Sequence, residues 1–271
     1  MSVTLDLFAA AGFDRLSILQ RELSARVDET DADAVFVESS DDEFGLTAWA
    51  RAFLRSPATA TGFGLYSLVG YALYALGTRS ISSPQECAAD RLETDRSTPV
   101  YRVEGSSSGL FSTGGLVSTL VEWVAVAATA FVFSATGVAT TVAAAFLAPT
   151  AVRLVARSTQ TLAALLAVLL TPAVALLLVV DTGSTAALAV GVFAFLVASA
   201  RQTGDRAAAT LDRVERVSAE HGHERVLLLA TQTTVSNLRG RQSDSPGPEI
   251  ASAWVRRAFR EGRRSEATTD A

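Results

Sequence analysis

An almost uncharged block runs from Leu116 to Ala200 and limits what this chain can fold into more than any other feature. The residues in it that carry charge at neutral pH are Glu122, Arg153, Arg157 and Asp181. A helix needs about 20 predominantly apolar residues to cross the hydrocarbon core of a bilayer. The block is long enough for three or four such helices, so we expect an integral membrane protein.

We predict four transmembrane spans, at about residues 116–134, 137–155, 161–180 and 184–200. Arg153 and Arg157 lie at the turn between the second and third spans, and Arg201 follows the fourth. Because arginine collects in cytoplasmic loops, we expect a multi-pass protein of the cell membrane with both termini in the cytoplasm. The alternative is three spans, in which the first pair forms one long tilted helix.

The charges inside the block lie near span ends. Glu122 is close to the start of the first span, beside Trp123, and Asp181 ends the third. A transporter or channel usually buries ionisable groups along its pathway. The positions of these two acids favour an anchor of helices packed through small residues, with a small transporter or channel as the alternative.

Outside the block, segments with helical and strand-like patterns alternate. The expected helices are at residues 15–27, 84–92 and 205–221, and the expected strands at 34–37, 99–103 and 224–230. Such alternation indicates a mostly parallel sheet. The last helix and strand are too small to fold alone. We therefore predict one cytoplasmic α/β domain, split in sequence between residues 1–115 and 201–240 and joined to a bundle of about four transmembrane helices at 116–200.

Two further segments are ambiguous. Residues 58–76 are apolar and uncharged, and we expect a buried or membrane-hugging helix there, with a fifth span as the alternative. Residues 241–271 are expected to form a linker and a basic amphipathic tail that includes a helix from Trp254 to Arg260. Such a helix suits an anionic membrane surface or a solvated terminus equally well.

Composition narrows the class of protein. All 23 basic residues are arginine, the net charge is −5, and this acidic, lysine-free composition resembles that of proteins from extreme halophiles. Cys87 is the only cysteine, so neither an intrachain disulfide nor a thiolate metal cluster is possible. The first thirty residues lack the apolar core of a signal peptide. The basic tail lacks interleaved aromatic residues, so we expect no nucleic-acid partner.

Few residues are candidates for chemistry. Glu38 follows an expected buried strand, and ligand-facing groups of α/β folds lie at the carboxyl ends of strands. The alternative interpretation is that Glu38 has no functional role and simply begins a solvated acidic loop. His221 and His223 could bind a metal, but no third ligand is evident. The sequence contains no phosphate-binding glycine loop and no nucleophile elbow.

Three stretches resemble the TraB family of pheromone-shutdown proteins, which is akin to the TIKI membrane proteases. They are Asp33-Ala-Val-Phe-Val-Glu38, then Pro84-Gln-Glu-Cys-Ala-Ala89 with Pro99-Val-Tyr-Arg-Val-Glu104, and finally residues 201–238. The resemblance implies an α/β domain with a polar cluster of Glu38, Glu86 and Arg102. It also implies a metal-dependent hydrolase.

The departures from that family concern its expected histidine motifs. No histidine lies upstream of His221, and we expect the first strand of the family's domain to be missing at the start of this chain. The stretch Leu229-Ala-Thr-Gln-Thr-Thr234 has no Gly-x-x-His. We therefore expect a degenerate, non-catalytic TraB-like domain without cofactor, which regulates or binds a peptide or protein partner at the lipid bilayer. A membrane-bound peptidase that holds a divalent metal is the alternative.

Overall fold

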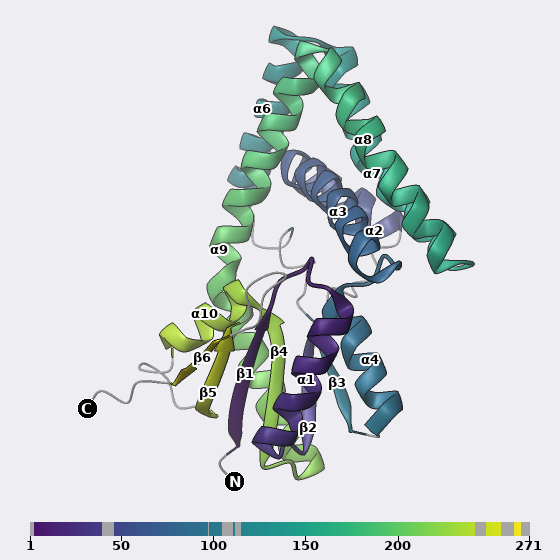
Figure 1. Ribbon diagram of the computed structural model, residues 1–271. Coiled ribbons are helices and arrows are strands. Elements are labelled where there is room, and N and C mark those ends of the chain that lie inside the picture. The colour runs from purple at the N-terminus through teal and green to yellow at the C-terminus, as the bar shows by residue number, and fades with distance from the viewer. Residues whose placement is uncertain are drawn as a thin grey trace. The chain divides into compact units, whose positions relative to one another are not determined.

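The computed structural model describes residues 3–39, 46–96, 98–104, 111, 115–241, 248–255 and 263–266 (Figure 1). The chain divides into two compact units. The sheet unit comprises Met1–Asp41, Ser82–Gly105 and Thr203–Ala271. The helical unit comprises Asp42–Ile81 and Ser106–Gln202. Each unit is thus assembled from separate stretches of sequence.

The sheet unit contains a six-stranded sheet in the order β3-β2-β4-β1-β5-β6. Its strands are β1 (Thr4–Ala10), β2 (Ala34–Ser39), β3 (Val100–Glu104), β4 (Arg225–Thr231), β5 (Glu249–Val255) and β6 (Arg263–Glu266). The first five are parallel to their neighbours, and β6 runs antiparallel to β5. The prediction of a mostly parallel sheet is confirmed.

Helices cover both faces of the sheet, because alternate side chains of each buried strand point to opposite faces. On one face, Phe8, Val35 and Leu229 pack against α1 (Leu16–Thr30) and α4 (Pro84–Arg96). On the other face, Leu7, Phe36 and Leu228 pack against the second half of α9 (Thr182–His221) and against α10 (Gln232–Arg241). The sheet unit is therefore a three-layer α/β/α sandwich.

Strands β1, β5 and β6 were not expected from the sequence. The expectation that the first strand is missing is wrong, because Thr4–Ala10 forms β1 between β4 and β5. Asp6 interrupts the apolar pattern of this strand and is nevertheless buried, with a hydrogen bond from Ser252 on β5. The helix expected from Trp254 is wrong at its start, because Trp254 and Val255 end β5. Residues 256–262 lie outside the described residues.

The helical unit is built from α2 (Leu46–Arg55), α3 (Pro57–Thr78), α6 (Leu116–Val132), α7 (Ala135–Ala156), α8 (Gln160–Val180) and the first part of α9. Among the residues that the structure describes, three helical segments are long and apolar enough to cross a membrane: α7, α8 and Thr182–Gln202 of α9. Helix α6 is also apolar but has only 17 residues. Helices α6 and α7 are separate, and the hydroxyl of Ser134 between them accepts a hydrogen bond from the amide of Gly137 at 3.0 Å.

The apolar segment 58–76 lies within α3, which belongs to the helical unit and not, as its place within residues 1–115 suggested, to the sheet unit. Small residues bring α3 close to its neighbours. A Cβ on Gly62 would lie 2.0 Å from the carbonyl oxygen of Gly191 on α9, and one on Gly64 would lie 2.1 Å from that of Ala145 on α7. Close backbone approach through small residues is typical of packing between membrane helices.

This packing generates a matched pair of substitutions. We expect Gly62→Ala to lower the free energy of unfolding by about 1–3 kcal/mol, because the added methyl group must displace the α9 backbone. Gly70→Ala on the same helix is the control, since its Cβ would meet no atom closer than 3.9 Å. Unfolding by denaturing detergent, followed by circular dichroism, measures both. Equal stability of the two variants would contradict the close α3–α9 contact.

Candidate functional site

The carboxyl edge of the parallel sheet is the place where the topology favours a ligand site. From the end of β1 the chain enters α1 on one face of the sheet, whereas from the end of the adjacent β4 it enters α10 on the other face. Strands whose connections leave in opposite directions open a crevice at their carboxyl ends, where open α/β sheets bind ligands. Glu38 and Ser39 end β2, the other neighbour of β4.

Glu38 is half-buried and contacts the start of α10. Its carboxylate accepts hydrogen bonds from the amide of Thr231 and the hydroxyl of Thr234, both at 2.9 Å. The hydroxyl of Thr231 in turn accepts the amide of Thr234 at 3.3 Å, which is the contact of an N-cap residue. Glu38 thus adds a negative charge at the positive end of the α10 dipole.

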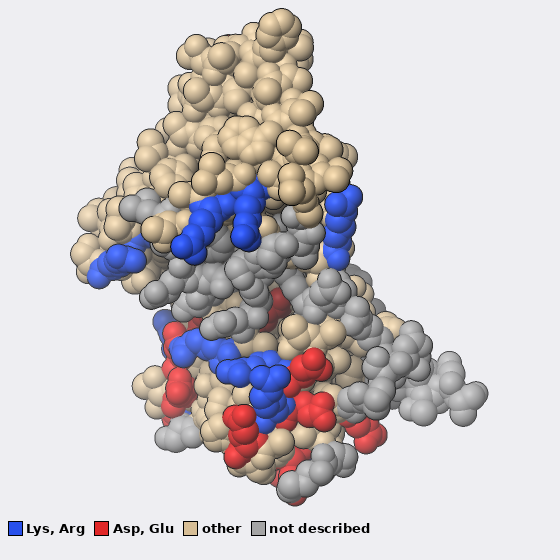
Figure 2. Space-filling model, turned by 180° about the vertical axis from the view of Figure 1, so that it is seen from behind, with Lys and Arg blue, Asp and Glu red and all other residues tan. Residues whose placement is uncertain are grey.

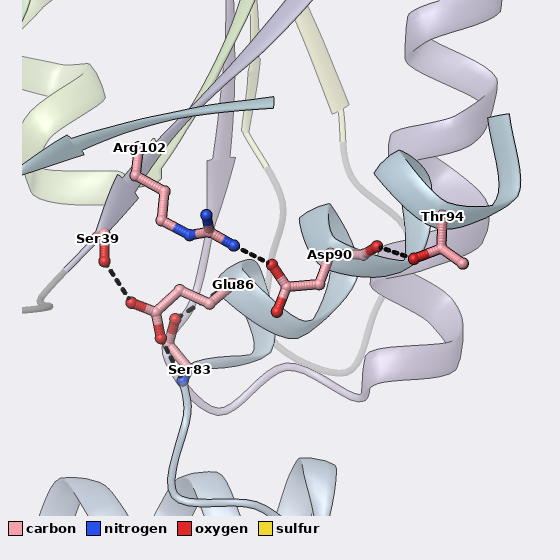
Figure 3. A network of polar contacts seen from close by, with 6 residues as sticks. All are labelled: Ser39, Ser83, Glu86, Asp90, Thr94 and Arg102. Carbon is pink, nitrogen blue, oxygen red and sulfur yellow. Dashed lines mark hydrogen bonds and ion pairs between the residues drawn. The ribbon is translucent and has the colours of Figure 1, made fainter. Parts of the chain in front are cut away.

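Glu86 lies in the first turn of α4 and forms a reciprocal capping box with Ser83 (Figure 3). The amide of Ser83 donates to Oε2 of Glu86 at 3.0 Å, and the amide of Glu86 donates to the Ser83 hydroxyl at 3.2 Å. Oε1 of Glu86 accepts the hydroxyl of Ser39 at 2.7 Å. Glu86 therefore joins the end of β2 to the start of α4.

Arg102 projects from β3 toward α4 and pairs with Asp90, at 2.5 Å between Nη2 and Oδ1 (Figure 3). The two side chains are 48% and 54% exposed. An ion pair this exposed contributes about 0–1 kcal/mol. The Arg102–Asp90 pair is therefore a surface contact between β3 and α4.

The contacts of Glu38, Glu86 and Arg102 therefore go to different partners. Glu38 and Ser39 are adjacent in β2, so their side chains point to opposite faces of the sheet. Glu38 reaches α10 on one face, whereas Ser39 reaches Glu86 of α4 on the other. Arg102 pairs in register with Val37, whose side chain packs on the α4 face.

The two histidines lie near the opposite end of the sheet, where β4 begins. The hydroxyl of Tyr101 and Nε2 of His223 are 3.0 Å apart, and Nδ1 of His221 is 2.9 Å from the carbonyl oxygen of Val217. The two imidazole rings are stacked with centroids 5.9 Å apart. Among the residues that the structure describes, no three His, Cys, Asp or Glu side chains are grouped so that they could hold a metal ion.

Asp33 is a structural residue that the sequence analysis did not single out. Its carboxylate accepts the amides of Glu224 and Arg225 at 2.9 and 3.0 Å and so ties the start of β2 to the start of β4. These two backbone hydrogen bonds, with Arg225 first, lower the pKa of Asp33. The signal in the sequence is an aspartate directly before a buried strand.

The two acids of the uncharged block also bind helix N-termini. Glu122 on α6 accepts the amide and the hydroxyl of Thr59, in the first turn of α3, at 3.0 and 2.9 Å. Asp181 accepts the amide of Ser184, in the first turn of α9, at 2.8 Å. The four carboxylates that the sequence marked as candidates for chemistry or transport thus all contact the start of a helix: Glu38, Glu86, Glu122 and Asp181.

Comparison of the chain with protein-family models, with curated proteins and with solved structures gave no match.

The capping box of Glu86 generates a second pair of substitutions. We expect Glu86→Ala to lower the free energy of unfolding by about 1 kcal/mol, because the amide of Ser83 loses its acceptor. Glu86→Gln keeps an acceptor at the same position and should stay close to the parent protein. Thermal denaturation of the purified protein in detergent measures both. A Glu86→Ala protein as stable as the parent would contradict the capping role.

Proposed function

We propose that this chain is a multi-pass protein of the cell membrane that carries a degenerate, non-catalytic TraB-like α/β domain, whose role is to regulate or to bind a peptide or protein partner. The observation that carries this proposal is the engagement of Glu38 and Glu86. Each bonds backbone and hydroxyl groups at a helix start. Carboxylates held in this way support the fold.

Sheet pairing supports an even number of membrane crossings. Strand β4 pairs with β1 and with β2, so the chain before the uncharged block and the chain after it meet in one sheet. A chain that leaves and rejoins the same sheet crosses the bilayer an even number of times. Helices α7, α8 and the first part of α9 supply three crossings. We propose that α6 supplies the fourth.

The length of α6 is compatible with this role. Its 17 residues extend about 26 Å at about 1.5 Å per residue, and about 17 residues is the lower end of the range for transmembrane helices. The same reasoning applies to α3, which lies between β2 and β3 of one sheet. The ten-residue α2 is too short to supply a second crossing. We therefore propose that α3 enters and leaves the bilayer on the same side.

The arginines support the orientation. Arg153 and Arg157 lie at the end of α7, whereas the residues from Phe133 to Thr136 and from Asp181 to Ser184 contain no arginine. By the distribution of positive charge, the α7–α8 turn and the sheet unit lie in the cytoplasm. The carboxyl edge of β1, β4 and β2 is the part of the sheet unit where we place the binding of a partner.

Two measurements test this function, alkaline extraction of isolated membranes and metal analysis of the purified full-length protein. We expect the protein to stay with the membrane pellet at alkaline pH. After equilibrium dialysis, the purified protein should retain about 0.1 equivalents of Mn, Co or Zn or less, an order of magnitude below the amount that one site would hold. Glu38→Gln, which keeps an acceptor for Thr231, should leave the metal content unchanged.

Two outcomes would contradict the proposal in different ways. Release into the alkaline supernatant would mean that the helical unit does not span a bilayer. Retention of about one equivalent of metal that Glu38→Gln abolishes would favour the alternative, a metal-dependent hydrolase that uses Glu38, Glu86 and Arg102.

A further inference from the structure

Three arginines lie at or near the ends of α3 and α7, two helices that pack against each other. Arg79 is the C-cap of α3, with a positive φ of 62°, and Arg157 is the C-cap of α7. Arg153 lies one turn before Arg157 on α7, and its Nε donates to the hydroxyl of Tyr71 on α3 at 2.5 Å. The cluster is therefore built from two helices that pack against each other.

Further contacts hold the two turns together. The hydroxyl of Ser80 donates to Oε1 of Gln160 at 3.1 Å, which joins the residue after Arg79 to the first residue of α8. Ile81 packs in the same apolar cluster as Val155 and Ala156. Arg79 and Arg157 thus flank one short stretch of surface, and both are exposed.

No acid offsets this charge among the described residues of the helical unit. That part of the chain contains six arginines: Arg51, Arg55, Arg79, Arg153, Arg157 and Arg201. Its acids are Glu122 and Asp181, which are engaged at helix starts. No ion pair of Arg79 or Arg157 is found within the described residues. Figure 2 shows arginines gathered along the border of a large uncharged surface.

An exposed apolar stripe on α3 leads directly to Arg79. Tyr66, Val69, Leu73 and Leu76 recur every three or four residues and are 60%, 45%, 42% and 73% exposed. Residues three and four apart share one face of a helix. The opposite face, with Leu68 among others, is buried against α7 and α8. Helix α3 thus presents an apolar strip that ends in a guanidinium group.

We propose that Arg79, Arg153 and Arg157 bind the phosphate headgroup of an anionic phospholipid whose acyl chains lie along the stripe of Tyr66, Val69, Leu73 and Leu76. The inference rests on the proposed function, since it requires the helical unit to be embedded in a bilayer. Guanidinium groups match phosphate oxygens through paired hydrogen bonds and remain charged at every physiological pH. The stripe favours a lipid over free phosphate, because an inorganic anion leaves these apolar side chains uncovered.

The test uses full-length protein in nanodiscs that contain equal amounts of phosphatidylglycerol and phosphatidylcholine. After release into mild detergent, native mass spectrometry measures which lipid stays bound. We expect the parent protein to retain phosphatidylglycerol in preference to phosphatidylcholine. The double variant Arg79→Gln/Arg157→Gln should lose this preference by roughly 25-fold, at about fivefold per arginine removed.

The double variant Arg51→Gln/Arg55→Gln on α2 is the matched control, because it removes the same charge from exposed positions of the same unit. We expect it to keep the preference. Equal losses in the two double variants would overturn the proposed site in favour of general attraction to an anionic surface. The single variants Arg79→Gln and Arg157→Gln, each expected to lose about fivefold, keep the test valid if the double variant does not fold.

Two further outcomes separate this inference from its premises. Displacement of the bound lipid by millimolar inorganic phosphate, with equal phosphate binding in lipid-free detergent, would identify free phosphate as the ligand. Protein that enters phosphatidylcholine nanodiscs but shows no preference for phosphatidylglycerol would overturn the lipid site and leave the proposed function intact. Protein that enters no nanodisc would overturn the proposed function itself.

Discussion

The parallel pairing of β4 between β1 and β2 is the contact on which the rest of the structure depends. It joins chain segments that precede the uncharged block to a segment that follows it. Buried on both faces and bonded on both edges, β4 has all five residues from Val226 to Ala230 in the core. Asp33 secures the amino end of the strand and Glu38 the carboxyl end. This closure is the basis of our proposal that the chain enters and leaves the bilayer on one side.

Carboxylates contact the starts of helices in both units. The first amides of a helix have no partner within the helix, and a carboxylate both accepts them and complements the dipole. In the helical unit these hydrogen bonds also compensate the carboxylates, because an uncompensated carboxylate in an apolar environment is costly. Glu122 and Asp181 both meet this requirement. Their positions are explained by helix geometry without a transport pathway.

Sequence reasoning succeeded where the signal is local. The strands near residues 34–37, 99–103 and 224–230 and the helices around them are visible as short apolar or periodic runs. Three of the four predicted spans have the length and hydropathy to cross a membrane. The helix at 84–92 was expected, but its capping box was not recognised, although Ser83 and Glu86 are only three positions apart. The resemblance to the TraB family stays a prediction.

What the sequence could not provide depends on distant partners. The burial of Asp6 in β1 requires Ser252, which is 246 residues away in the chain. Glu38 finds its partner 193 residues away, and Glu122 finds Thr59 at a separation of 63. No local pattern encodes these contacts. The division of Glu38 and Glu86 between two faces likewise follows from the pairing of strands, which sets the direction of each side chain.

The most direct test of the central claim is the sidedness of single cysteines in a Cys87→Ala background. The exposed positions Ala135 and Thr182 probe the α6–α7 and α8–α9 turns, Ser158 probes the α7–α8 turn, and Arg21 and Glu220 probe the sheet unit. An impermeant maleimide should label cysteines at 135 and 182 in intact cells, and those at 21, 158 and 220 only after permeabilisation. Labelling of 21 and 220 from opposite sides would contradict the four-crossing arrangement.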